Sequence, residues 1–381
     1  MRIIFKKNVV SEAVSYALCA VSNQRTISAI QGILVETIGE NKCCFSSFDL
    51  EKGVRVVIEA QIEEPGSCII DAQRLGQIIK IMPENTITLS LKNDVAVLES
   101  GKSEFEVFAQ GKEAFPSLPD LDTNIGFTMK QKDLYSMISQ TLFAVSQSLQ
   151  RPVFTGELVR IENNSISVVG CDGYRMAVKE KECDLSDATP NISTKVIVPG
   201  KTLSELMKMI GDVDEEIEIK ASTKHIIFEI KEKELMFFSR LLEGDYIDYE
   251  RLIPKQFNTF VYVYTDVMIS SLERASLVSE ENTTAGSKSF VKLSVTDGRC
   301  EISSVSSKGK VKDEIPIEKE GADIDIGFSC KYLIDALKAC KSEKVKISLA
   351  SPLISMVMEP DDAEKEASEK LTMLILPIKL K

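Results

Sequence analysis

The chain has 381 residues, a formal net charge of −12 and 44% hydrophobic residues. A chain of this length predicts two or three domains, and no apolar run reaches the roughly 20 residues that span a membrane. The first ten residues, MRIIFKKNVV, lack the apolar core and cleavage site of a signal peptide. We therefore expect a cytoplasmic protein without a membrane partner.

Three similar units follow one another along the chain. Each has an opening helix pattern, an aspartate in a turn between two strands, a second amphipathic helix, and a strand of alternating apolar and polar residues. In chain order these features lie at 8–24, Asp49, 71–82 and 83–91; at 130–147, Asp172, 199–210 and 212–221; and at 265–281, Asp297, 329–340 and 341–350.

The spacing of the repeats is nearly constant. The first leucines of the second helices, Leu75, Leu203 and Leu333, are 128 and 130 residues apart. The first apolar strand residues are 130 and 128 apart, and they are Ile87, Ile217 and Val345. We predict an α+β protein of three repeated domains, each with two helices packed on an antiparallel sheet. The predicted domains are 1–121, 126–253 and 256–381.

The sequence shows no catalytic pattern. His225 is the single histidine, and the nine cysteines include no CxxC pair. The segment PGKT at 199–202 resembles the end of a phosphate-binding loop, but Lys195 stands where that loop needs glycine. We predict no catalytic residue, no metal site, no cofactor and no enzymatic activity. A hydrolase with an unrecognised site is the weakest alternative.

Basic residues concentrate on the second helix of each unit. These helices carry seven basic and three acidic residues, in a chain of net charge −12. The basic residues are Arg74, Lys80, Lys201, Lys208, Lys331, Lys338 and Lys341. If the helices line an inner wall, a basic lumen inside an acidic exterior suits duplex DNA held through its phosphates without base reading. These helices show no aromatic stacking platform, which argues against recognition of single strands.

Four segments, together with the three repeats, resemble the bacterial sliding clamp family, the beta subunits of DNA polymerase III. They are CDGYRMAV at 171–178, VIVPGKTLSELMKMI at 196–210, GDYIDYERLIP at 244–254 and LILPIKL at 374–380. The resemblance covers the full chain. It implies a head-to-tail homodimer that closes a ring around double-stranded DNA, binds without sequence specificity, and tethers the replicative polymerase without catalysis of its own. The clamp loader and other proteins with clamp-binding peptides are further implied partners.

The resemblance also implies a peptide-binding pocket between the second and third domains. Its residues would be Phe154, Cys171, Gly173, Tyr174, Arg175, Met176, Ile247, Leu252, Leu374, Leu376, Pro377, Ile378 and Lys379. Partners insert a glutamine and apolar side chains there, and Arg175 and Lys379 would take polar ends of the peptide. Cys171, Tyr174 and Ile247 stand where relatives usually have threonine, histidine and proline, which leaves the preferred peptide open.

The C-terminal segment LTMLILPIKLK, 371–381, has apolar residues on both faces of a predicted strand. We expect its first half to complete the third sheet, and pairing to stop at Pro377, which has no amide hydrogen to donate. The rest would line the pocket, and a partner protein's peptide would cover the second apolar face.

The resemblance carries two further sets of residues. The dimer joint would use Phe105 and Val107 opposite Leu277 and Val278, with Arg74 close by. The candidate DNA-facing residues are Gln24, Arg25, Lys80, Arg151, Lys201, Lys208, Lys331 and Lys338. The alternative function is a three-domain peptide-binding scaffold that does not encircle DNA.

Overall fold

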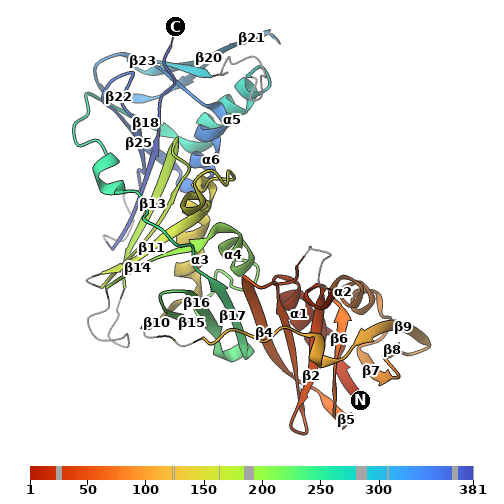
Figure 1. Ribbon diagram of the computed structural model, residues 1–381. Helices are drawn as coiled ribbons and strands as arrows, with labels where there is room; N and C mark the ends of the chain where they lie inside the picture. Colours follow the sequence, from red (N-terminus) through yellow and green to blue (C-terminus); the bar gives the residue numbers. More distant parts are fainter. Residues whose placement is uncertain are drawn as a thin grey trace. The chain divides into compact units, whose positions relative to one another are not determined.

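The structure is a computed structural model that describes residues 1–22, 28–121, 123, 125–162, 164–183, 193–279, 290–306, 309–362 and 368–380. No helix in these ranges is long and apolar enough to cross a membrane. The chain divides into two compact units (Figure 1). Unit 1 contains Met1–Leu134 and Lys201–Leu241, and unit 2 contains Tyr135–Asp184, Ser193–Gly200 and Leu242–Lys381.

Unit 1 is built on one antiparallel sheet, in the strand order β10-β15-β16-β17-β4-β3-β2-β6-β9-β8-β7-β1-β5. Its strands are β1 (Arg2–Lys6), β2 (Gly32–Ile38), β3 (Lys42–Phe48), β4 (Lys52–Glu59), β5 (Gln61–Glu64), β6 (Ser67–Asp71), β7 (Thr86–Lys92), β8 (Val95–Ser100), β9 (Ser103–Gln110), β10 (Ile125–Lys130), β15 (Glu216–Ala221), β16 (His225–Ile230) and β17 (Leu235–Arg240). Its helices are α1 (Lys7–Leu18) and α2 (Ala72–Ile81), with α4 (Gly200–Leu206) beginning at the unit boundary.

Unit 2 has two antiparallel sheets, in the orders β14-β11-β12-β13-β26-β25-β24-β18-β22 and β21-β20-β19-β23. The first contains β11 (Gly156–Glu162), β12 (Ser165–Cys171), β13 (Arg175–Glu182), β14 (Thr194–Pro199), β18 (Thr259–Tyr264), β22 (Glu318–Gly321), β24 (Lys344–Leu349), β25 (Met356–Pro360) and β26 (Glu369–Ile375). The second contains β19 (Val291–Thr296), β20 (Arg299–Ser306), β21 (Gly309–Pro316) and β23 (Ile324–Phe328). The helices are α5 (Thr265–Ser276) and α6 (Cys330–Cys340), while α3 (Gln131–Thr141) begins in unit 1.

The predicted repeats are present. The second helices are α2, α4 and α6, and each is followed by an alternating strand, β7, β15 or β24. The evenly spaced residues at 75, 203, 333, 87, 217 and 345 are all buried. The second of these helices is shorter than expected. It ends at Leu206, and the amides of Lys208 and Met209 then bond to the carbonyls three residues back, which tightens the chain into turns before Gly211.

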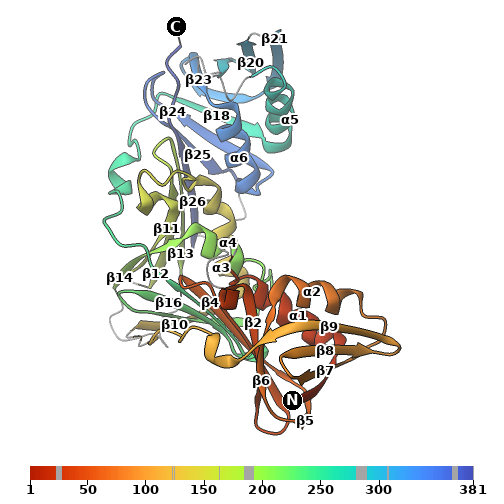
Figure 2. The same cartoon turned by 45° about the vertical axis from the view of Figure 1, so that its right-hand side comes forward.

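Neighbouring repeats share sheets through two equivalent strand pairs. In unit 1, β17 pairs with β4 from Leu235↔Val56 to Ser239↔Lys52. In unit 2, β26 pairs with β13 from Arg175↔Ile375 to Lys181↔Glu369 (Figure 2). We call these the first and second joints.

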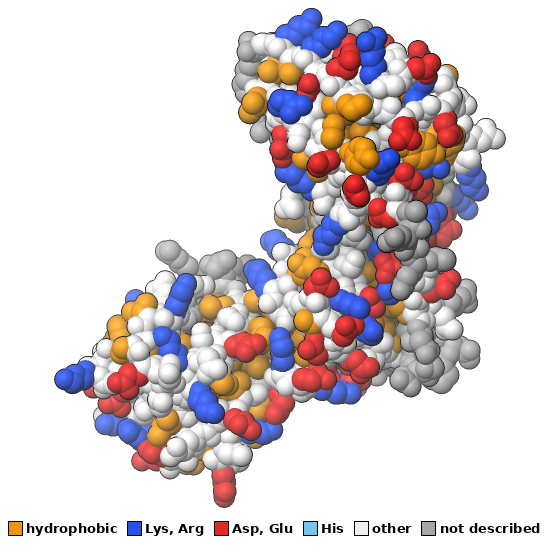
Figure 3. Space-filling view, turned by 180° about the vertical axis from the view of Figure 1, so that it is seen from behind, with side chains coloured by type: hydrophobic (Ala, Val, Ile, Leu, Met, Phe, Trp, Pro, Cys, Tyr) orange, Lys and Arg blue, Asp and Glu red, His pale blue; other side chains and the backbone are white. Residues whose placement is uncertain are grey.

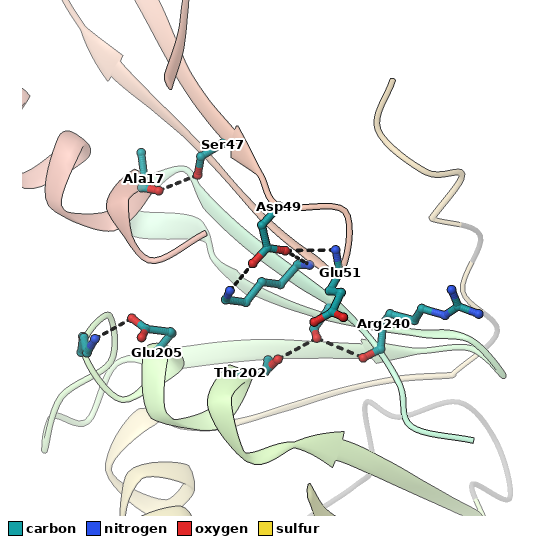
Figure 4. Close-up of polar contacts among 10 residues, drawn as sticks. Ala17, Ser47, Asp49, Glu51, Thr202, Glu205 and Arg240 are labelled. Atoms are coloured by element: carbon teal, nitrogen blue, oxygen red, sulfur yellow. Dashed lines mark hydrogen bonds and ion pairs between the residues drawn. The ribbon is translucent and has the colours of Figure 1, made fainter. Parts of the chain in front are cut away.

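The aspartate turn beside each joint has the same hydrogen bonds. At the first joint, Asp49 Oδ1 accepts from the amides of Glu51 (3.0 Å) and Lys52 (2.8 Å) (Figure 4). The amide of Arg240, at the end of β17, donates to the Glu51 carbonyl at 2.7 Å. Leu50 occupies this turn with a φ of 78°, a left-handed conformation that costs free energy for any residue but glycine.

Strand β26 buries both faces within the chain, so the expectation that a partner's peptide covers its second apolar face is wrong for Leu374. Leu371, Met373 and Ile375 belong to the core of the third repeat, with the buried faces of α5 and α6. Leu374 points into a second cluster with Cys171 and other residues of the second repeat. The strand therefore joins two cores, which explains an apolar run so near the end of the chain.

Candidate functional site

The turn between β12 and β13 is the centre of the candidate site. Asp172 Oδ1 accepts hydrogen bonds from the amides of Tyr174 (2.8 Å) and Arg175 (2.9 Å). Gly173 adopts a φ of 88°, which favours glycine, and the space where its side chain would stand is open. The turn is thus fixed by its own aspartate and presents bare backbone at Gly173.

The C-terminal segment runs beside this turn. The amide of Leu376 donates to the Tyr174 carbonyl at 2.9 Å, one residue beyond the last ladder pair of β26. After Pro377, the amide of Ile378 donates to the carbonyl of Gly327 in β23 at 2.8 Å. The regular ladder therefore ends at the proline, as expected, and the tail continues across to the other sheet of unit 2.

Arg175 is held by groups of the second and third repeats. Its Nε lies 3.1 Å from Asp172 Oδ2, and its Nη1 lies 2.6 Å from Asp335 Oδ2 in α6. The guanidinium also lies over the ring of Tyr332 (4.4 Å to the centroid) and near that of Phe143 (5.2 Å). The side chain is 9% exposed, so its charge is already satisfied within the chain.

An apolar cluster lies beneath the turn. Its buried members are Leu158, Val169, Cys171, Met176, Val178, Ile197, Tyr249, Val357 and Leu374, and Tyr246, Ile247 and Ile253 pack against them half-buried. Burial raises the pKa of the Cys171 thiol, which accepts a hydrogen bond from the Gly173 amide at 3.4 Å. Cys171 therefore acts as a small neutral hydrophobic residue.

A cavity of about 610 Å³ opens on the outer side of the turn. We call it the turn cavity. It is bounded by the loop 145–151, by the turn 172–175 and by the first turn of α6. Its lining residues are Val145, Ser146, Gln147, Ser148, Gln150, Arg151, Phe154, Asp172, Gly173, Tyr174, Arg175, Lys331 and Tyr332.

Eight of the thirteen residues expected in the pocket fall into two groups, and the other five belong to neither. Phe154, Gly173, Tyr174 and Arg175 line the turn cavity, and Cys171, Met176, Ile247 and Leu374 belong to the apolar cluster. Leu252 (43%) and Leu376 (45%) are exposed apolar side chains, whereas Pro377 and Ile378 are half-buried and Lys379 is exposed.

Sequence reasoning missed Val357, Tyr332 and Asp335 in this site. The pairing of β25 with β26 places Val357 opposite Leu374, and this register is invisible in the sequence. Lys331 and Arg151, predicted to face DNA, line the same cavity as Tyr174.

A larger cavity of about 990 Å³ lies in unit 1, beside α1 and the corner from β4 to β5. Its polar groups are largely occupied with one another: Lys233 Nζ donates to the Tyr16 hydroxyl at 2.8 Å, and that hydroxyl bonds to Glu12. None of the predicted site residues lines it, so its size does not make it the functional site. Among the residues that the structure describes, no group of three or more His, Cys, Asp or Glu could hold a metal ion.

Comparisons with known proteins match the whole chain. Family models of the DNA polymerase III beta subunit match residues 1–119 (N-terminal domain), 128–248 (central domain) and 250–379 (C-terminal domain). The beta sliding clamp of Bacillus subtilis is 31% identical over 392 residues, covering 100% of both chains. The chain belongs to the DNA polymerase III beta subunit family.

Solved structures agree with this assignment. The sliding clamp of Bacillus subtilis superposes with a TM-score of 0.90 at 30% identity, and a putative beta subunit from Eubacterium rectale with 0.89 at 28%; both matches cover 100% of each chain. The expected three-domain clamp fold is confirmed. The expected function is confirmed as well: the chain is a non-catalytic accessory subunit, a processivity factor of DNA polymerase III in replication.

Of the residues expected at a clamp dimer joint, Phe105 and Val107 lie in β9, whereas Leu277 and Val278 directly follow helix α5 and Arg74 lies in α2. In unit 1, one edge of β9 pairs with β8 over residues 103–108. On its other edge β9 pairs with β6 only at Ala109 and Gln110, so residues 103–108 have one edge without a described neighbour. In unit 2, β21 is the terminal strand of its sheet. Leu277 is 78% exposed and Arg74 is exposed, whereas Phe105 and Val278 are half-buried and Val107 is 8% exposed.

Exposed apolar side chains near these edges were missed by the sequence analysis. Phe108, next to Val107 in β9, is 85% exposed, and Val305 in β20 is 70% exposed. Strand alternation places Phe108 on the face opposite to Val107, so a signal was present in the sequence. It was hidden because both faces of β9 carry apolar residues.

The candidate DNA-facing residues are mostly exposed lysines on the second helices. Lys80, Lys201, Lys331 and Lys338 lie on α2, α4 and α6, and Lys208 follows α4; all five are exposed. Two of them are paired: Lys208 with Glu205 at 2.6 Å and Lys338 with Glu273 at 2.7 Å. Gln24 and Arg25 lie outside the described residues. On the face drawn in Figure 3, basic and acidic side chains are interspersed.

Proposed function

We propose that this clamp works as a head-to-tail homodimer that closes around double-stranded DNA, with β9 of one copy beside β21 of the other. Both strands have an edge without a neighbour among the described residues, and both lie near exposed apolar side chains. Edges of this kind risk aggregation in a monomer, and mutual pairing removes the risk. DNA would be held through its phosphates by the lysines of the second helices.

The dimer is tested by substitution at the exposed apolar residues. Phe108→Asp and Leu277→Asp should each convert a species of about twice 42.2 kDa into a monomer in light-scattering measurements. Leu353→Asp is the matched control, because Leu353 is an exposed leucine too (70%) but lies in the turn between β24 and β25. A wild-type chain that elutes as a monomer at micromolar concentration would exclude the stable ring.

Encirclement of DNA is tested by topology. A ring loaded on a nicked circle should stay bound and should be lost when the circle is linearised, because it slides off the ends. The alternative, a three-domain scaffold that binds peptides without encircling DNA, predicts equal loss from both forms. The partners proposed here, duplex DNA, the polymerase catalytic subunit and the clamp loader, imply a cytoplasmic protein.

The second part of the proposal is that the turn cavity and the adjoining tail bind short peptides of these partner proteins. The observation that carries this proposal is the hydrogen bond from the Leu376 amide to the Tyr174 carbonyl. It holds the exposed side chains of Leu376 and Tyr174 on neighbouring segments, beside the open backbone at Gly173. A concave site with apolar anchors and a few polar groups suits a peptide of one glutamine and apolar side chains.

Deletion of the tail tests this site. Removing Pro377–Lys381 should abolish binding of polymerase-derived peptides, measured by fluorescence anisotropy, and should leave the dimer intact in light scattering. The β26 ladder ends at Ile375, so the truncated chain keeps its sheet. Unchanged peptide affinity would reduce the tail to a structural cap on β23.

A further inference from the structure

Two large apolar side chains are exposed at corresponding places of different repeats. Phe108 in β9 is 85% exposed, and Val305 in β20 is 70% exposed. Single exposed apolar residues are common on protein surfaces, so exposure alone assigns them no role. Their positions within the repeats do, because the equivalent residues of the other repeats are in contact.

Phe108 corresponds to the residues that cross the two joints within the chain. The segments LMFFSR of β17, LTMLI of β26 and FEVFAQ of β9 all have apolar residues at their first, third and fourth positions. The fourth residues are Phe238, Leu374 and Phe108. Phe238 pairs with Gly53 across the first joint, and Leu374 pairs with Met176 across the second. Phe108 holds the same place in β9, on a stretch with one edge that lacks a described neighbour.

Val305 corresponds to the residues that receive those side chains. It is the seventh residue of β20, as Phe48 is of β3 and Cys171 is of β12. Each of the three pairs with the next strand of its repeat, at the residue that faces the joint in the first two repeats. For Val305 this residue is Lys310 in β21, the terminal strand of its sheet.

The equivalent residues pack together at both joints within the chain. The rings of Phe238 and Phe48 have centroids 5.6 Å apart at the first joint. Leu374 and Cys171 belong to one apolar cluster at the second joint. All four side chains are buried. The pair in β9 and β20 is thus the third of a set, and it is the pair that stays exposed in a single copy of the chain.

We infer that two copies of the chain form a third joint of the same construction, in which Phe108 of one copy packs on Val305 of the other. This inference rests on the proposed head-to-tail dimer and names the residues that meet in it. Both internal joints are antiparallel and in equivalent register. The same register places Phe108 opposite Lys310, whose aliphatic stem can cover the ring while its ammonium group stays in water.

A charged pair next to this contact agrees with the register. Glu106 precedes Phe108 by two residues and would lie opposite Lys312, which follows Lys310 by two. Both side chains are exposed. Glu106 has no ion-pair partner within the described part of the chain, whereas Lys312 Nζ lies 2.7 Å from Glu301 in its own sheet. Opposite charges directly across an antiparallel pair stabilise it.

The next pair along the strands opposes this register. Glu104 would face Glu314, and like charges at this distance weaken a strand pair. Arg299 Nη1 lies 3.5 Å from Glu314 Oε2, which reduces the repulsion. A shift of β9 by two residues would pair Glu104 with Lys312 instead, but it would move Phe108 away from its apolar partner. The two registers are separated by the experiment below.

Cysteine cross-linking tests the register. Residues directly opposite each other in an antiparallel pair have Cα atoms about 4.5–5.5 Å apart, within reach of a disulfide. Phe108→Cys combined with Lys310→Cys, and Glu106→Cys combined with Lys312→Cys, should each give a covalent dimer of about twice 42.2 kDa on a non-reducing gel after mild oxidation. Wild type, which has nine cysteines, gives the background.

Glu106→Cys combined with Lys310→Cys is the matched control. These two residues face each other only in the shifted register. In the inferred register they are diagonal neighbours, about 7–8 Å apart, which is beyond the usual span of a disulfide. This variant should therefore stay uncoupled under the same oxidation.

Val305→Ala tests the apolar contact itself. The change removes two methyl groups at each joint of the ring, so the dissociation constant of the dimer should rise by about tenfold or more in analytical ultracentrifugation. Val213→Ala is the control, because Val213 is another exposed valine (40%) but lies between α4 and β15. It should leave the dissociation constant unchanged.

The outcomes separate the inference from the dimer beneath it. A dimeric wild type whose variants cross-link through residues 106 and 310, or through none of the three pairs, would overturn the inferred register alone. An unchanged dissociation constant in Val305→Ala would overturn the contact between Phe108 and Val305. A wild-type chain that stays monomeric would overturn the proposed dimer as well.

Discussion

An ion pair between Arg175 and Asp335 connects the second and third repeats: Nη1 of Arg175, in strand β13, lies 2.6 Å from Oδ2 of Asp335, in helix α6. The same guanidinium stacks on Tyr332, three residues before Asp335 on that helix. The turn that carries Gly173 is therefore positioned by the third repeat as well as by its own aspartate. The geometry of the proposed peptide site thus depends on the second joint.

Arg175→Met should loosen this connection. It keeps the apolar stem but leaves Asp172 and Asp335 without their cation, so we expect a loss of roughly 2 kcal/mol in the free energy of unfolding, below the range for fully buried pairs because Asp335 is partly exposed. Urea unfolding measures the loss. Arg175→Lys should lose less, because it keeps the charge but not the fork and the stack. Identical unfolding curves for wild type and Arg175→Met would contradict this role.

The first joint has the same backbone arrangement as the second, but different side chains pack in it. Its ladder pairs Phe238 with Gly53, where the second joint pairs Leu374 with Met176. The ring of Phe238 covers Gly53 and packs on the ring of Phe48, with 5.6 Å between their centroids. An aromatic pair therefore fills the first joint, whereas two aliphatic side chains meet at the equivalent place of the second joint.

Gly53→Ala tests the close fit at the first joint. A β-carbon at residue 53 would lie 2.3 Å from the Cζ atom of Phe238, so the ring has to move. We expect a loss of about 1–3 kcal/mol, typical of overpacked cores, seen as a lower thermal midpoint. Gly126→Ala, in β10 of the same sheet, is the control, because its nearest neighbour would be the Lys220 side chain at 3.7 Å. Equal midpoints for the two variants would show that Phe238 has free space.

The sequence contained most of the fold and half of the site. Periodicity and spacing predicted the helices, the strands after them and the aspartate turns, because these depend on local patterns that recur three times. The apolar C-terminal segment predicted a strand with two covered faces, but the cover of the second face was expected from a partner's peptide and comes from the second repeat. The partners of Arg175, the position of Val357 and the filling of the first joint depend on register between strands distant in sequence, which no local pattern contains. The predicted domain limits and the dimer joint stay predictions.

Acid should weaken the second joint through Glu369. Burial alone would raise the pKa of this carboxyl, but hydrogen bonds from Lys179 and Lys181 outweigh it and lower the pKa to about 2. Because the folded state holds the charged form more strongly than the unfolded chain, this stabilisation is present above about pH 4.5 and is lost as the pH falls toward 2.

Glu369→Gln removes that contribution and leaves buried Lys179 without its anion. At pH 7 we expect a loss of about 1–2 kcal/mol after allowance for solvent screening. Between pH 4.5 and 2, the difference in unfolding free energy between wild type and variant should narrow. Glu359→Gln is a control, because half-buried Glu359 has only a 3.9 Å link to exposed Lys370 and a hydrogen bond from Thr372. A difference that stays constant over this pH range would contradict the assignment to Glu369.

Alkali should weaken unit 2 through Glu157, a fully buried carboxyl in β11. Neither of its oxygens accepts a hydrogen bond from the described residues, and the nearby Thr141 hydroxyl donates to the Met137 carbonyl at 2.8 Å. Burial raises the pKa of Glu157 to about 8. Tyr246, whose own pKa is also raised by burial, is a titratable neighbour.

The sign of the effect is opposite to that of Glu369. The unfolded chain releases this proton near pH 4.5 and the folded chain near pH 8, so the stability of unit 2 should fall as the pH rises between these values. The full shift corresponds to roughly 5 kcal/mol. Glu157→Gln, which cannot ionise, should remove this slope from unfolding free energies measured between pH 5 and pH 9. Glu162 lies near the end of the same strand, and Arg160 lowers the pKa of its carboxyl. Glu162→Gln should therefore keep the slope. If the slope survived in Glu157→Gln, the buried carboxyl would not be its source.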